Sequence, residues 1–82
     1  MKKVLLVDDD ASVRDALGQT LELADMVPIL ARSVIEAKDH ISTEFDGVVV
    51  SDVRMPGKDG FDLLAHSQSI DKNLPVILLT GE

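Results

Sequence analysis

The chain has 82 residues, enough for one small domain and fewer than the commonest domain size of about 100 to 150 residues. Its net charge of −7 and its two aromatic residues, Phe45 and Phe61, argue against nucleic-acid binding, which needs a basic face or aromatic stacking platforms. The chain contains no cysteine, so disulfides and thiolate metal sites are excluded. No apolar run is long enough for a signal peptide or a membrane span, and a cytoplasmic location is therefore expected.

The first elements follow from the apolar pattern. Residues 4–7 form a continuous apolar run, which is typical of a strand buried on both faces of a sheet. Apolar residues then recur at helical spacing from residue 13 to residue 24, which predicts an amphipathic helix. Asp10 and Ser12 are both suited to cap its first turn, and the pattern leaves the choice between them open.

A second strand is predicted over residues 27–31, followed by a second helix. Pro28 lies inside this strand, and because proline has no amide hydrogen to donate to a ladder, the strand belongs at an edge of the sheet. Ser33 followed by Glu36 has the spacing of a capping box. We therefore expect a helix that begins here and runs through Ile41.

The second half of the chain repeats this alternation. Three valines at residues 48–50 predict a third strand that ends at Asp52. One proline and two glycines between residues 55 and 60 mark a structured loop, and the apolar residues within 61–65 predict a short helix. The last predicted strand covers residues 76–79.

The order of these elements is β-α-β-α-β-α-β, which predicts an α/β domain with a parallel sheet and helices on both faces. Right-handed crossovers and an edge position for the second strand favour a flavodoxin-like, doubly wound sheet with strand order 2-1-3-4. The first and third strands are then neighbours. A crevice opens at their carboxyl ends, where ligands bind in such folds.

Three carboxylates are expected in this crevice. Asp8 and Asp9 follow the first strand, and Asp52 ends the third. Clustered carboxylates repel one another unless a cation neutralises them, and oxygen ligands with room for water suit Mg²⁺. A carboxylate beside such a metal can attack phosphorus, with the metal neutralising the phosphoryl charge. The hydroxyl of Thr80, after the fourth strand, could reach the same phosphoryl group.

Three segments carry a resemblance to a known family: VLLVDDD, VVVSDVRMPGKDG and LPVILLTGE. Together they resemble the receiver domain of bacterial two-component response regulators, in the family's order and through the whole chain. The D-x-R-M-P-G-x-D-G segment is the most specific part. Among receivers, these segments are most similar to those of receivers attached to enhancer-binding transcriptional activators, such as dicarboxylate-transport regulators.

The resemblance implies a role for each site residue. Asp52 is the residue phosphorylated and also a metal ligand, Asp8 and Asp9 serve Mg²⁺, the backbone carbonyl of Arg54 is a further ligand, and Thr80 is the switch hydroxyl. A sensor histidine kinase is the implied donor, and an output domain that regulates transcription is the implied partner in the intact protein. The domain is not an enzyme in the ordinary sense, although it promotes its own phosphoryl transfer.

The family continues with another helix, a fifth strand and a final helix. Residues 1–82 are therefore expected to be a receiver domain truncated at its C-terminal end. The fifth strand is then missing, and with it the lysine that, by the resemblance, contacts the phosphoryl group from the end of that strand. Lys58 is not expected to replace that lysine, because it lies in the loop after Asp52. The strand at residues 76–79 would then be an uncovered apolar edge, which favours aggregation, strand exchange or a homodimer.

Some of these residues also have plainer interpretations. The run at residues 8–10 could simply cap a helix and favour its positive dipole end, and Asp10 is divided between capping and tuning the metal. Arg14 and Arg32 are predicted to be solvated surface charges.

Two rival functions stay open at this point. A phosphatase of the haloacid-dehalogenase type also begins with an apolar strand ending in D-x-D, here Asp8 and Asp10, and Thr80 could imitate its later threonine or serine. Asp8, not Asp52, would then be the nucleophile. Against this, the helical pattern resumes by Val13, which leaves little room for that family's insertion, and VSDVRMPGKDG is unexplained. The other rival is a non-phosphorylated interaction module on the same fold, which the complete acidic set argues against.

Overall fold

The computed structural model describes residues 2–79 and contains one parallel sheet with strand order β2-β1-β3-β4. The strands are β1 (Lys3–Val7), β2 (Val27–Ala31), β3 (Gly47–Asp52) and β4 (Val76–Leu79). The helices in this part of the chain are α1 (Ala11–Leu23), α2 (Val34–Lys38) and α3 (Gly60–Ile70). The alternation and the strand order confirm the predicted flavodoxin-like, doubly wound α/β fold.

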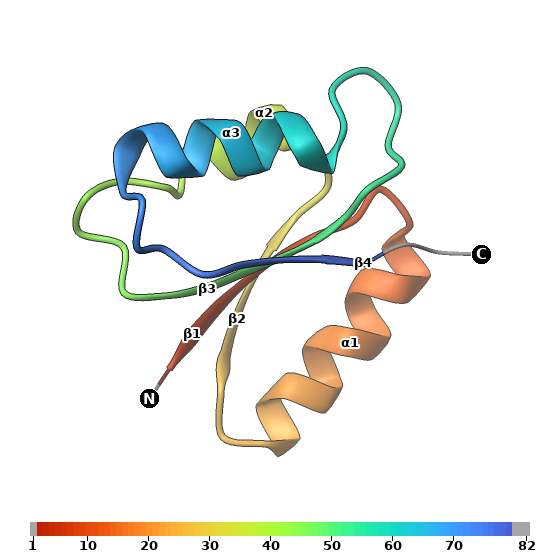
Figure 1. Ribbon diagram of the computed structural model, residues 1–82. Coiled ribbons are helices and arrows are strands. Elements are labelled where there is room, and N and C mark those ends of the chain that lie inside the picture. Colours follow the sequence, from red (N-terminus) through yellow and green to blue (C-terminus); the bar gives the residue numbers. More distant parts are fainter. Residues whose placement is uncertain (1, 80–82) are drawn as a thin grey trace.

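The sheet is covered on both faces, with α1 on one side and α2 and α3 on the other (Figure 1). The main core lies under α2 and α3, where Leu5, Val7 and Val49 pack against Val34 and Leu63. The alternate residues of β1 face α1 and are also buried. Burial on both faces is the reason why β1 reads as an unbroken apolar run.

The two edges of the sheet match their sequence signals. Pro28 lies in β2, which pairs on one side only, with β1. β4 forms the other edge among the described strands and pairs with β3. Its residues Ile77 and Leu79 are 50% and 42% exposed, so the strand is an apolar edge as predicted. A homodimer through this edge stays a prediction.

The helix ends settle one choice that the sequence left open and differ from the sequence pattern at the end of the second helix. Asp10, not Ser12, caps α1, since its side chain accepts hydrogen bonds from the amides of Ser12 and Val13. The second helix ends at Lys38 rather than Ile41. The amides of residues 39, 40 and 41 donate to carbonyls three residues earlier in the chain. These are hydrogen bonds of the 3₁₀ type, so the α-helical geometry ends before them.

The predicted capping box at Ser33 is only half formed. The Ser33 hydroxyl accepts a hydrogen bond from the Glu36 amide, but the Glu36 carboxylate accepts from the Arg32 amide instead of that of Ser33. A complete capping box occurs at α3, where Asp59 and Asp62 each accept from the other's backbone amide. α3 begins at residue 60, directly after this cap. It ends at Ile70 and is therefore longer than the short helix expected over residues 61–65. None of the helices within residues 2–79 is long and apolar enough to cross a membrane.

Candidate functional site

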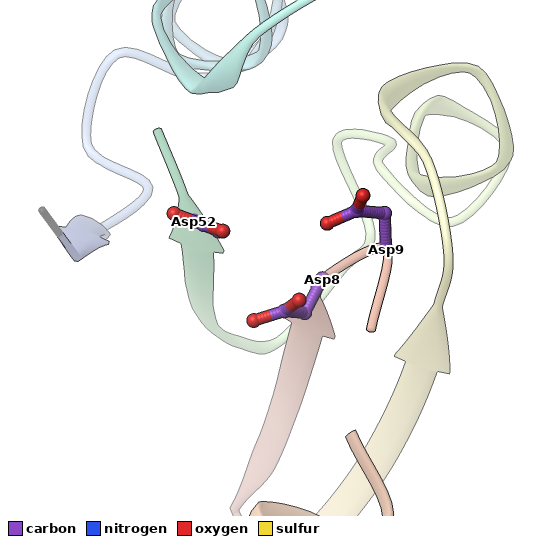
Figure 2. Close-up of side chains that lie close together, drawn as sticks. All are labelled: Asp8, Asp9 and Asp52. Atoms are coloured by element: carbon purple, nitrogen blue, oxygen red, sulfur yellow. The ribbon is translucent and has the colours of Figure 1, made fainter. Parts of the chain in front are cut away.

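The register of β1 and β3 brings the predicted acidic residues together. The two strands run parallel, with Val7 opposite Ser51, so the residues that follow, Asp8 and Asp52, lie side by side at the carboxyl edge of the sheet. Carboxylate oxygens of Asp8, Asp9 and Asp52 all lie within 4.8 Å of one another. Figure 2 shows the three side chains around one shared space. They line an open depression together with Asp10, Val13 and Leu79.

Asp8 is the most firmly held of the three. Its side chain is buried, with 7% of the residue exposed. Its amide donates to the Ala31 carbonyl of β2 at 3.1 Å, and its Oδ1 accepts from the Asp10 amide at 2.9 Å. The Asp8 carbonyl accepts from the Arg14 guanidinium at 2.8 Å. The amide, the carbonyl and Oδ1 of Asp8 therefore each have a fixed neighbour, whereas Oδ2 accepts no hydrogen bond from the described residues.

Asp52 lies at the end of β3 and is half-buried. Its Oδ1 accepts a hydrogen bond from the Arg54 amide at 3.3 Å, so the chain turns back over the carboxylate immediately after the strand. The next residue, Val53, donates its amide to the Leu79 carbonyl and accepts from the Gly60 amide. The carboxyl end of β3 is thus hydrogen bonded to both β4 and α3.

The three carboxylates of this site form no ion pair with a basic side chain in the described part of the chain; the Arg14 guanidinium contacts the Asp8 carbonyl instead. A buried carboxylate such as Asp8 is costly beside two like charges unless a cation compensates them. Exposed Asp9 leaves an open side for water and for ligand.

The donor set fits a small divalent cation. Mg²⁺ binds oxygen at about 2.0–2.1 Å, so neighbouring ligands of an octahedral site lie about 3 Å apart and opposite ligands about 4.2 Å apart. The three carboxylate oxygens lie within 4.8 Å of one another, so the side chains would have to draw closer together to bind one ion. Asp8, Asp9 and Asp52 could therefore hold Mg²⁺, with water or a phosphoryl oxygen at the remaining positions.

The other predicted residues divide as follows. Asp10 caps α1, as its plainer interpretation predicts, and a role in tuning the metal stays a prediction. Arg54 is adjacent to the cluster through its amide, and its carbonyl as a metal ligand stays a prediction. Thr80 lies outside the described residues. Arg14 is a correction: it was expected to be a solvated charge, but it is half-buried and hydrogen bonded to Asp8.

Comparison with known proteins decides the family. The family model of the response regulator receiver domain matches residues 4–82. The chain belongs to this family. Receivers are signalling domains of two-component response regulators, so the assignment confirms the resemblance and leaves the phosphatase alternative without support.

Two curated relatives are transcriptional regulators. The C4-dicarboxylate transport transcriptional regulatory proteins DctD of Rhizobium meliloti (strain 1021) and Pseudomonas aeruginosa are each 46% identical to this receiver, over 78 and 79 residues. The alignments cover 95% and 96% of this chain and 17% of each relative. The chain thus spans only a small part of the length of the curated relatives that it matches.

Solved receiver structures match the fold over the whole chain. The non-phosphorylated HemR receiver domain from Leptospira biflexa has a TM-score of 0.93 and 30% identity, with 66% of that chain covered. Chemotaxis protein CheY4 of Vibrio cholerae has a TM-score of 0.91 and 34% identity, with 70% covered. The response regulator TrrA from Thermotoga maritima, solved in complex with Mg²⁺-BeF, has a TM-score of 0.92 and 28% identity, with 71% covered.

Proposed function

We propose that this receiver accepts a phosphoryl group on Asp52, with Mg²⁺ bound by the carboxylates of Asp8, Asp9 and Asp52 and by the carbonyl of Arg54. The observation that carries the proposal is the meeting of three carboxylates from two strand ends within 4.8 Å. The Mg²⁺-BeF complex of the related TrrA supports the choice of cation.

In this proposal Asp52 reacts with the phosphoryl donor, and Asp8 and Asp9 bind the cation. An Asp52 carboxylate oxygen attacks phosphorus and forms an acyl phosphate, while the bond from phosphorus to the donor breaks and the donor leaves with its electron pair. Asp8 and Asp9 hold the cation beside the attacked phosphorus. When bound, Mg²⁺ neutralises the charge that develops on the phosphoryl oxygens. The receiver promotes its own phosphorylation in this way, without turning over a substrate as an enzyme does.

The proposed donor is a sensor histidine kinase, and the proposed recipient of the signal is an output domain that regulates transcription. The first is supported by a solved complex of histidine kinase ThkA with TrrA, which is 28% identical to this chain. The second is supported by the DctD relatives, which are transcriptional regulators. In this scheme Thr80 is the hydroxyl that responds to the phosphoryl group, and the protein acts in the cytoplasm.

We also propose that residues 1–82 are the leading part of a receiver that continues through another strand and its flanking helices. The solved receiver chains support this, because this chain covers 66% to 71% of their length in the three matches. A lysine that contacts the phosphoryl group is expected on the strand after residue 82. Phosphorylation assays should therefore include a chain that contains this strand.

The test is intact mass after incubation with acetyl phosphate, with and without Mg²⁺. It is run on this chain and on the chain extended to the length of the solved receivers. The expected result is one added phosphoryl group on the extended chain, dependent on Mg²⁺ and absent from Asp52→Asn. Asp10→Asn is the matched control, because asparagine caps a helix as well as aspartate does.

Each alternative predicts a different pattern. Labelling that survives in Asp52→Asn and disappears in Asp8→Asn would indicate the phosphatase chemistry. A folded extended chain that gains no phosphoryl group with Mg²⁺ would refute the proposal and favour an interaction module.

A further inference from the structure

Arg14 reaches back from the first turn of α1 to the end of β1. Its guanidinium Nη1 donates to the Asp8 carbonyl at 2.8 Å, across six positions of sequence. Its backbone amide donates to the carbonyl of Asp10, the residue that caps the helix. The side chain is half-buried although it carries a charge. One residue therefore ties the helix start to the strand end.

A cation is out of place at this position on local grounds. The first turn of a helix has a positive dipole end and favours acidic side chains. α1 has no acidic residue in its first turn, and Arg14, its fourth residue, lies at the end of that turn. A residue that departs from local preference is expected where tertiary structure or function compensates. The hydrogen bond to Asp8 is that compensation.

The choice of acceptor is informative. Arg14 bonds to the carbonyl of Asp8 and forms no ion pair with a carboxylate among residues 2–79. An arginine paired with the carboxylate itself would occupy an oxygen that a metal needs. Bonding to the carbonyl fixes the turn and leaves Oδ2 of Asp8 available. The Asp8 amide and Oδ1 are fixed by Ala31 and Asp10, so Arg14 completes the set of restraints.

We propose that Arg14 is a positioning residue for the acidic site: its bond to the Asp8 carbonyl sets the turn that aims the Asp8 and Asp9 carboxylates at Asp52. The inference rests on the proposed function, because it takes the shared cation as Mg²⁺. Arg14 does not touch the cation. It lowers the cost of gathering the ligands before binding, as outer residues around metal sites do.

The test compares two explanations that predict opposite changes in the affinity for Mg²⁺. Removing a positive charge near a cation site strengthens cation binding if charge alone matters. Losing a restraint on the ligands weakens it. We would titrate Mg²⁺ into the ¹⁵N-labelled chain, extended to the length of the solved receivers, and follow the amide resonances at 8–10 and 52–54. Variants are Arg14→Gln, Arg14→Met and Arg14→Lys, with Arg32→Gln as the matched control.

Arg32 is a suitable control because it follows β2, next to β1, yet it is exposed and pairs only with Glu36 among the described residues. The expected result is a dissociation constant for Mg²⁺ about 10-fold higher in Arg14→Gln and Arg14→Met, the lower end of the range for outer-shell mutations. Arg14→Lys should recover part of the loss, and Arg32→Gln should change little. Unfolding midpoints measured without Mg²⁺ separate this effect from general destabilisation.

An equal or lower dissociation constant in Arg14→Gln would overturn the inference and leave Arg14 a simple charge. A similar loss in Arg32→Gln would overturn it too, since no specific bond would then be needed. If Arg14→Gln does not fold, Arg14→Met answers the same question. A wild-type receiver that shows no Mg²⁺ response refutes the proposed function first, whereas normal Mg²⁺ binding in the Arg14 variants refutes only the positioning role.

Discussion

Gly60 packs its Cα against the backbone carbonyl of Asp52, so closely that a methyl group on Gly60 would lie 2.7 Å from that oxygen. The Gly60 amide also donates to the Val53 carbonyl at 3.0 Å. The first residue of α3 is therefore in direct contact with the backbone of the proposed phosphoacceptor. Movement at one of these two positions has to be accommodated by the other.

Gly60→Ala should destabilise the fold and slow phosphorylation together. The added methyl has to displace either the end of β3 or the start of α3, and overpacking of this kind costs about 1–3 kcal/mol. Denaturant unfolding and the rate of phosphoryl gain from acetyl phosphate would measure the two effects. The control is Gly57→Ala, where φ is +81° and no atom is within 4 Å of the new methyl. It should lower stability through backbone strain while leaving the rate per folded molecule unchanged.

Gly47→Ala should be more damaging, although it lies far from the acidic site. A methyl here would overlap the Lys3 carbonyl oxygen on the neighbouring strand. Backbone cannot move aside without opening the pairing of β1 with β3, so we expect a loss of about 3 kcal/mol in the free energy of unfolding. Urea unfolding would measure it, and wild-type stability in the variant would contradict the close approach.

Gly18→Ala should stabilise the protein. Gly18 is buried in the interior of α1, and a new methyl would meet only the Leu30 side chain, at 3.5 Å and 3.7 Å, which is ordinary contact. Alanine is preferred to glycine inside a helix by about 0.8–1.0 kcal/mol. Thermal unfolding should show a higher midpoint. A lower midpoint would mean that α1 and β2 are packed more tightly than these distances indicate.

Mg²⁺ should raise the stability of the wild-type receiver and do so less in Asp9→Asn. A ligand that binds only the folded state adds about 2.7 kcal/mol at 100 times its dissociation constant. Without Mg²⁺ the Asp9→Asn variant should be more stable than the wild type, because the substitution relieves repulsion among the three carboxylates. The measurement is thermal unfolding with MgCl₂ or with NaCl at equal ionic strength. If the two salts raise the unfolding midpoint equally, salt only screens the repulsion among the carboxylates and no specific Mg²⁺ site is present.

Asp10→Ala should cost about 1 kcal/mol of stability, and Asp10→Asn should cost almost none. The Asp10 side chain accepts from the amides of Ser12 and Val13, and asparagine can accept the same bonds. Mg²⁺ affinity should stay close to wild type in Asp10→Asn, in contrast to Asp9→Asn. Calorimetric titration of both variants would check this, and a matching loss of affinity would restore Asp10 to the metal site.

Much of the fold and the site was predictable because burial leaves a direct trace in the sequence. β1 is apolar at every position because both of its faces are covered, and Pro28 identifies an edge because it cannot donate to a ladder. With the strand order set, parallel strands have to end at one edge. That alone places Asp8 beside Asp52, although 43 residues separate them in the chain.

The remaining features depend on contacts that leave no periodic trace. The pattern could not show that Arg14 would reach the Asp8 carbonyl, because the reach of a long side chain depends on how the turn before α1 is folded. Nor could it show that Glu36 would accept from Arg32 instead of completing a capping box. The sequence by itself determined the element order, the sheet topology and the meeting of the aspartates. Only the tertiary structure decided how their backbone is held, since the bond from Arg14 to Asp8 and the close approach of Gly60 to Asp52 depend on how the turns after the two strands fold.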